Sequence, residues 1–173
     1  MREILVQVSP QDTTITAEQW PEMEKELASD IDTEIWEDFL LDSKVALREN
    51  DLHRATLYAA IACETFIKHQ IKLMASKHNI SNKFVNFIDG QEPSSRAVRY
   101  YGPILHLVTG RSLEDEENEL YKSIESIMKK RNKIMHEGKR SFTKDECTQI
   151  ANDIGKMEEA ISWVLNSSKE SKS

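Results

Sequence analysis

Cysteine, glycine and proline are scarce in this chain, and each scarcity excludes a class of protein. Two cysteines among 173 residues, Cys63 and Cys147, make neither a disulfide framework nor a set of metal ligands. Five glycines and four prolines are fewer than the turns of a sheet protein need. A chain of this length folds around one ordinary core, so it needs neither disulfides nor a metal.

Long apolar runs are missing too. No stretch approaches the roughly 20 apolar residues of a membrane span, and the N-terminus lacks the basic-then-apolar layout of a signal peptide. We therefore expect a cytoplasmic protein with no membrane partner. Because the sequence contains no Gly-rich phosphate loop, nucleophile elbow or dinucleotide fingerprint, and its histidines lack ligand spacing, we expect no cofactor and no metal.

What is abundant is charge, at 31% of residues, together with runs of Ala, Leu, Glu and Lys. These residues favour helices. The pattern predicts an all-α fold, a helical bundle of four to five main helices plus short helices. The main helices are expected at 33–48, 52–77, 112–137 and 143–166. The second is apolar around most of its circumference, which is typical of a central helix.

Local signals divide the rest of the chain. We expect a short strand or an extended arm at residues 4–8, and short helices and loops at 80–111. Three capping signals are clear: Ser112 with Asp115, Thr143 with Glu146, and Gly138 as a helix stop. We predict an acidic arm at 1–32, a helical domain at 33–166 and a disordered tail at 167–173.

Charge is unevenly distributed. Residues 12–42 carry eleven acids against Lys25 alone, whereas residues 129–144 carry seven Lys and Arg against Glu137 alone. The basic segment suits contact with a polyanion. The alternative is that acids open and lysines close the same helix, as the helix dipole favours. Both interpretations stay open.

One basic residue is out of place. The apolar stripe of the 112–137 helix includes Ile127 and Ile134, and the residue between them on this face is Arg131. Such a guanidinium must be paired, sit at an interface or line a cleft, because an uncompensated buried charge costs several kcal/mol. Asn132 follows it, and His136 lies five positions after it.

This arrangement resembles the RX4-6H motif of the HEPN superfamily, in which a polar residue commonly follows the arginine. The resemblance covers 33–166 and includes an acidic-then-amphipathic helix before the motif, a glycine and a capped helix after it, and the earlier stretch Ala62-Cys63-Glu64. It implies a HEPN-like bundle that often forms a homodimer with two motifs facing one cleft. It also implies, as in many members, a metal-independent endoribonuclease.

The resemblance implies RNA cleavage by the adjacent 2′-hydroxyl, leaving cyclic phosphate and 5′-hydroxyl ends. His136 is the expected proton carrier, and Arg131 is expected to stabilise transition-state charge beside Asn132. Glu64 either supports the arginine or forms a surface pair with Lys68 at i, i+4. The residues expected to bind RNA are Lys129, Lys130, Lys133, Lys139 and Arg140.

Helix geometry raises a difficulty, since Arg131 and His136 lie about 140° apart on an ideal helix. Three solutions are the length of the arginine, a helix that loosens before Gly138, and a dimer cleft that receives one residue from each chain. We favour the dimer. We expect a toxin or defence effector controlled by an antitoxin or defence-complex partner.

Two alternatives are a non-catalytic HEPN module that binds nucleotide or nucleic acid, and a structural dimer or adaptor in which Arg131 pairs with Glu64. Residues 12–42 either compete with RNA for the basic surface or form a solvated face. Tyr100 and Tyr101 either stack on bases or pack locally.

Overall fold

The computed structural model describes residues 34–78, 80–81, 83–84 and 97–170. Contacts divide the chain after Thr33, and all described residues belong to the second unit, Glu34–Ser173. The strand or arm expected at 4–8 and most of the acidic segment lie outside the described residues. Within the described part the chain forms helices and no strand, which confirms the predicted all-α class.

Five helices of the described chain have twelve residues or more, and four shorter helical segments connect the second of them to the third. The long helices are α2 (Ile35–Arg48), α3 (Leu52–Lys77), α8 (Asn118–Glu137), α9 (Lys144–Gly155) and α10 (Met157–Glu170). The short ones are α5 (Ala97–Arg99), the π-helical turn η1 (Tyr100–Ile104), α6 (Leu105–Thr109) and α7 (Leu113–Glu116).

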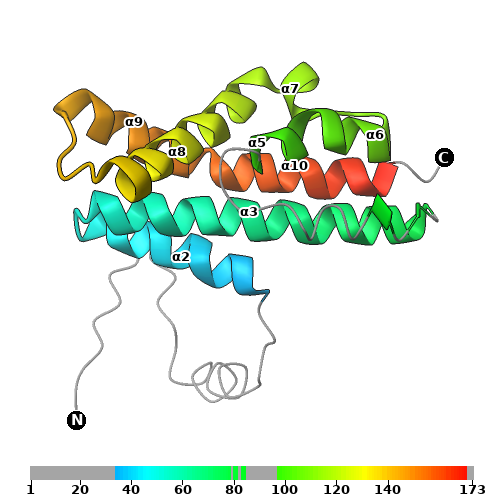
Figure 1. The fold of residues 1–173 in the computed structure, drawn as a ribbon, viewed down its shortest axis with the longest axis horizontal. Coiled ribbons are helices and arrows are strands. Elements are labelled where there is room, and N and C mark those ends of the chain that lie inside the picture. Colours follow the sequence, from blue (N-terminus) through cyan, green and yellow to red (C-terminus); the bar gives the residue numbers. More distant parts are fainter. Residues whose placement is uncertain (1–33, 79, 82, 85–96, 171–173) are drawn as a thin grey trace, which may run out of the picture. The chain divides into compact units, whose positions relative to one another are not determined.

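Helix α3 is the centre of the bundle, as its all-round apolar pattern predicts. It contacts α2, α6, α8, α9 and α10, and Figure 1 shows α2 on one side of it and α8 and α10 on the other. Its small buried residues, such as Ala55, Ala59 and Ala62, allow neighbouring helices to approach closely. The Trp36 ring packs edge-on against Phe66 of α3 at 4.9 Å between centroids.

Three helix boundaries differ from the prediction. Ser112 caps only the short α7, since the backbone of Glu117 (φ −134°, ψ 60°) leaves the helical region before α8 begins. Two helices stand where a single last helix was expected: α9 ends at Gly155, and α10 starts at Met157. Helix α10 also continues to Glu170, four residues into the segment expected to be disordered. Ser167 is buried there and donates to the Trp163 carbonyl at 2.9 Å.

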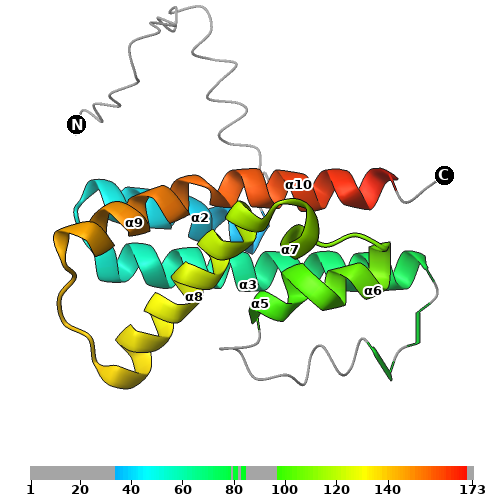
Figure 2. The same cartoon turned by 90° about the horizontal axis from the view of Figure 1, so that it is seen from above.

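Helix α8 leaves the core in its last two turns. Its buried residues are Leu120, Ser123, Ile124, Ile127 and Met128, and none follows residue 128. Figure 2 shows this C-terminal end running obliquely past α3. The Arg-Asn-x-x-x-His motif therefore lies on the projecting part of α8, where its side chains are half-buried or exposed.

Candidate functional site

The end of α8 is fixed by its glycine and by the turn that follows. Gly138 adopts the left-handed conformation (φ 64°), and the Lys139 N–H donates to the Lys133 carbonyl at 3.1 Å. This is the C-terminal stop that the sequence predicts. Helix α8 stays α-helical through Glu137. A loosened helix therefore does not bring Arg131 toward His136, which removes one of the three solutions to their angular separation.

Arg131 turns its guanidinium onto its neighbour. Arg131 Nη1 lies 3.0 Å from Asn132 Oδ1, and both residues are half-buried. Asn132 and His136 are i, i+4 neighbours on one helix face. The length of the arginine thus carries its charge toward the face that holds His136. The His136 side chain is exposed, and among the described residues it makes no hydrogen bond or ion pair.

Glu64 contacts a residue of its own helix. Its Oε1 lies 2.9 Å from Lys68 Nζ, and the two side chains are 13% and 21% exposed. This is the i, i+4 pair that the sequence offered as the alternative to support of Arg131. The described residues contain no ion pair between Glu64 and Arg131.

A buried polar network joins α8 to α9 beside the motif. Asp153 is only 1% exposed, and its Oδ2 lies 3.3 Å from Lys130 Nζ and 2.6 Å from the Ser126 hydroxyl, which donates to it. Lys130 also donates to Ser126, and the Gln149 amide donates to Asp153 Oδ1 at 2.8 Å. Sequence reasoning missed Asp153, although a carboxylate between Ile150 and Ile154 on an apolar face was a signal.

Lys139 fixes the turn after the motif. Its Nζ lies 2.6 Å from Glu146 Oε1, and its carbonyl oxygen lies 2.9 Å from His53 Nε2 at the start of α3. Glu146 also accepts from the Thr143 N–H at 2.9 Å, completing the predicted capping box. The Lys139 ammonium, together with the Thr143 N–H, lowers the pKa of Glu146 to about 2. The turn is thereby tied to both α3 and α9.

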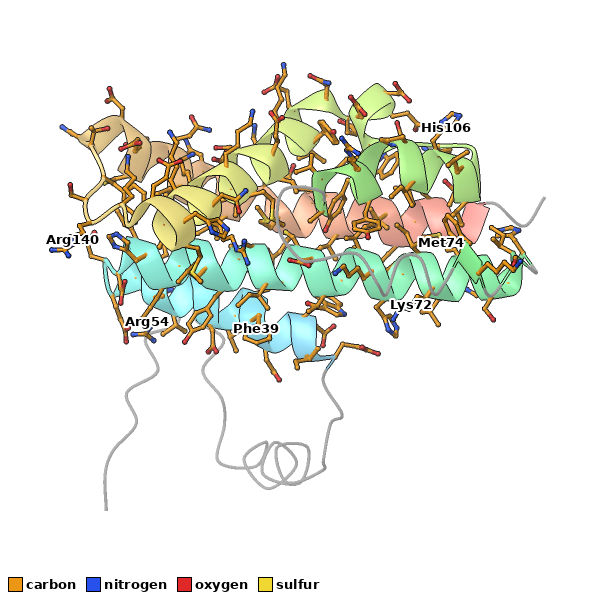
Figure 3. All side chains as sticks on the ribbon, viewed as in Figure 1. Phe39, Arg54, Lys72, Met74, His106 and Arg140 are labelled. Atoms are coloured by element: carbon orange, nitrogen blue, oxygen red, sulfur yellow. The ribbon has the colours of Figure 1, made fainter. Side chains whose placement is uncertain are left out.

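The other predicted RNA-binding residues differ in their freedom to bind. Lys129 Nζ pairs with Glu125 at 2.8 Å. Lys133 and Arg140 are exposed and form no ion pair among the described residues. Figure 3 shows Arg140 projecting from the turn between α8 and α9, whereas His106 lies at the opposite end of the bundle. Of the predicted RNA-binding residues, Lys133 and Arg140 are therefore the two without an ion-pair partner among the described residues, and they lie at the end of α8 and in the turn after it.

A cleft of about 300 Å³ adjoins Asn132. It lies between α8 and the segment of α5, and its lining residues are Val98, Arg99, Tyr121, Glu125, Met128, Lys129 and Asn132. The sequence did not predict it, because its two walls are distant in the chain. It adjoins the motif directly, since Asn132 both lines it and contacts Arg131.

Two other candidates from the sequence are structural. Tyr100 and Tyr101 are 2% and 0% exposed, and the Tyr101 hydroxyl donates to the Cys63 carbonyl at 2.7 Å. They pack locally and are not available to stack on bases. Burial raises the pKa of Cys63 to about 12, so this thiol is an inert core residue.

Comparison with known proteins adds no relative: no family model matches the chain, and neither a curated protein nor a solved structure matches it significantly. Among the described residues, His, Cys, Asp and Glu side chains nowhere gather in threes that could hold a metal ion. No helix of the described part is both long and apolar enough to cross a membrane.

Proposed function

We propose that this chain is a metal-independent endoribonuclease of the HEPN type, which cleaves RNA to cyclic phosphate and 5′-hydroxyl ends. One observation carries the proposal: the Arg131 guanidinium is turned onto Asn132, on the projecting end of α8 and one turn before an exposed His136. An arginine fork, an amide and an imidazole together supply charge stabilisation, positioning and proton transfer to one phosphate.

The reaction needs only these groups and water. The 2′-oxygen attacks the adjacent phosphorus while His136 accepts the 2′-hydroxyl proton. The bond from phosphorus to the 5′-oxygen breaks, and that oxygen takes a proton from water. Arg131 donates to the non-bridging oxygens as negative charge builds on them, where a planar fork is more effective than a lysine. Asn132 holds the guanidinium and offers its amide N–H groups to the same phosphate.

The biological role that fits such an enzyme is a toxin or defence effector. Its activity would then be controlled by an antitoxin or a defence-complex partner. We also propose a homodimer as its working form, since the motif resembles that of domains that often dimerise with two motifs facing one cleft; Met135, beside His136, is exposed (56%) on the same part of α8. Analytical ultracentrifugation at assay concentration tests the dimer; a monomer that cleaves RNA would contradict it.

The decisive experiment incubates purified wild type, His136→Ala and Arg131→Ala with mixed-sequence RNA in excess chelator, and identifies the end groups of any fragments. We expect cyclic phosphate ends from wild type and a rate lower by about 10²–10⁴-fold in His136→Ala, since proton transfer typically contributes that factor. His106→Ala is the matched control, because His106 is exposed and lies at the other end of the bundle from the C-terminal end of α8 that carries the motif. It should cleave at the wild-type rate.

RNA that stays intact with every protein would contradict the nuclease and favour the second candidate, a module that binds nucleotide or nucleic acid at the same place. The cleft beside Asn132, with Arg99 and Lys129 among its lining residues, favours this second candidate. It predicts RNA affinity that falls with salt and no fragments. The adaptor reading has less support, since the contact observed for Glu64 is with Lys68 and not with Arg131.

A further inference from the structure

We propose that the cleft beside Asn132 binds the nucleobase next to the scissile phosphate, and that it selects a base with an exocyclic amino group over uracil. The proposal rests on the proposed function for the position of the phosphate. It adds a base-binding subsite and a specificity-determining residue, Glu125.

The cleft has the size and surface of a site for one base. Its volume of about 300 Å³ is at the lower end of the range of small-molecule sites, which suits a single nucleobase. Val98 and Met128 are buried and provide an apolar floor. Tyr121 is half-buried and adds an aromatic ring. Bases of single-stranded RNA bind such rings by stacking, at about 1–3 kcal/mol per base.

The cleft is connected to the motif through one residue. Asn132 lines the cleft and also holds Arg131 at 3.0 Å. A phosphate at the guanidinium therefore lies within one nucleotide of the cleft, and a base attached to that phosphate reaches it. Arg99, exposed at the rim, is placed to attract a flanking phosphate.

Glu125 determines which base fits. A carboxylate only accepts hydrogen bonds. Cytosine and adenine present an amino group, and guanine presents an amino group beside a ring N–H, whereas uracil has a carbonyl on each side of its single ring N–H. Lys129 lies 2.8 Å from Glu125 Oε2 and offsets its charge toward RNA. The Tyr121 hydroxyl remains protonated, since burial, Glu114 and Glu125 raise its pKa, and it can donate to the same base.

Cytosine and uracil provide the sharpest test, because they differ only in the group at position 4 and its adjacent ring proton. The probes are fluorescent 2′-fluoro oligo-C and oligo-U of equal length, which lack the attacking hydroxyl and cannot be cleaved. Their affinities are measured by anisotropy for wild type and Glu125→Gln. Glu119→Gln is the matched control, since Glu119 is an exposed carboxylate on the same helix (75%).

We expect wild type and Glu119→Gln to bind oligo-C about tenfold more tightly than oligo-U, the factor of one hydrogen bond to a charged group. Glu125→Gln should lose this preference, because an amide also donates to a uracil carbonyl. Equal affinities in wild type, or a preference that survives in Glu125→Gln, would overturn the proposal. Since the probes are not cut, a base preference without ribonuclease activity supports the cleft and refutes only the nuclease. Cleavage without a base preference does the reverse.

Discussion

Neighbouring lysines on α8 have different surroundings, and these decide which of them is free to bind the RNA that we propose as substrate. Lys130 is 12% exposed and is paired with Asp153, which is 1% exposed. Lys133, one turn later, is exposed and has no ion-pair partner among the described residues. Sequence spacing gave both lysines the same expected role, because the partner of Lys130 lies on another helix.

Replacing Lys130 should therefore affect stability, whereas replacing Lys133 should affect RNA binding. Lys130→Ala leaves the buried Asp153 carboxylate without its ammonium, so the free energy of unfolding should fall by roughly 3–5 kcal/mol. Lys133→Ala should change it by less than about 0.5 kcal/mol. Instead, Lys133→Ala should weaken RNA binding. The slope of the logarithm of RNA affinity against the logarithm of salt concentration (the salt slope) should become shallower by about 0.7, the value for one lost phosphate contact on a single strand.

Urea unfolding and RNA titrations between about 50 and 200 mM salt measure these two effects. The titrations need a catalytically silent background such as His136→Ala. A stable Lys130→Ala protein with a reduced salt slope would show that Lys130 reaches RNA after all and that the network with Asp153 opens on binding.

The element that follows the motif, α9, begins with a charge-dependent cap. Glu146 accepts from the Thr143 N–H and pairs with Lys139, and these contacts lower its pKa from the ordinary 4.5 to about 2. A carboxyl with a lowered pKa stabilises the folded state fully above the pKa of the unfolded chain. That contribution is lost as the pH falls through the folded value.

Glu146→Gln should therefore be less stable than wild type at neutral pH. The difference should shrink as the pH falls from about 4.5 to about 2, because both proteins then carry an uncharged side chain at this position. Denaturant unfolding across that pH range measures it. Glu159→Gln, an exposed carboxylate on α10, is the control and should track wild type throughout. A difference in the free energy of unfolding between Glu146→Gln and wild type that stays constant with pH would mean that the cap does not depend on the charge of Glu146.

Helix ends were predictable wherever one residue carries the signal. Asp51 caps α3 by accepting from the Arg54 N–H at 3.1 Å, Gly138 ends α8, and the capping box opens α9, all local contacts visible in sequence. The breaks at Glu117 and Lys156 were not predictable, because the surrounding pattern continues through both. Helix propensity predicts such positions poorly, because tertiary packing overrides it there.

The candidate site also has a part that the sequence predicts and a part that it does not. The motif residues and the end of their helix follow from periodicity, since 3.6-residue spacing exposes a misplaced charge such as Arg131. The pair of Lys130 with Asp153 spans 23 positions, and the walls of the cleft come from α5 and α8. Such contacts depend on how helices pack, which spacing along a single helix does not determine.

Whether one chain or two chains supply the residues of the candidate site is the remaining question, and we propose one chain. Helix α8 is unbroken through Glu137, and the guanidinium of Arg131 already lies at Asn132 on the face of His136. The proposed homodimer would then carry two complete sites, each with its own arginine and histidine. The alternative favoured by helix geometry alone is a shared site in which each chain supplies one of them.

Mixing two inactive variants separates these arrangements. If each chain holds a complete site, equal amounts of Arg131→Ala and His136→Ala should cleave RNA no faster than either alone, because every site lacks one group. If the sites are shared, half of the randomly mixed dimers contain one intact site, and activity should return to about a quarter of wild type when proton transfer limits the rate. The two variants must first be unfolded and refolded together so that their chains exchange. Wild-type protein that is unfolded and refolded in the same way is the reference. We expect no recovery; a return near one quarter would place Arg131 and His136 of each site on different chains.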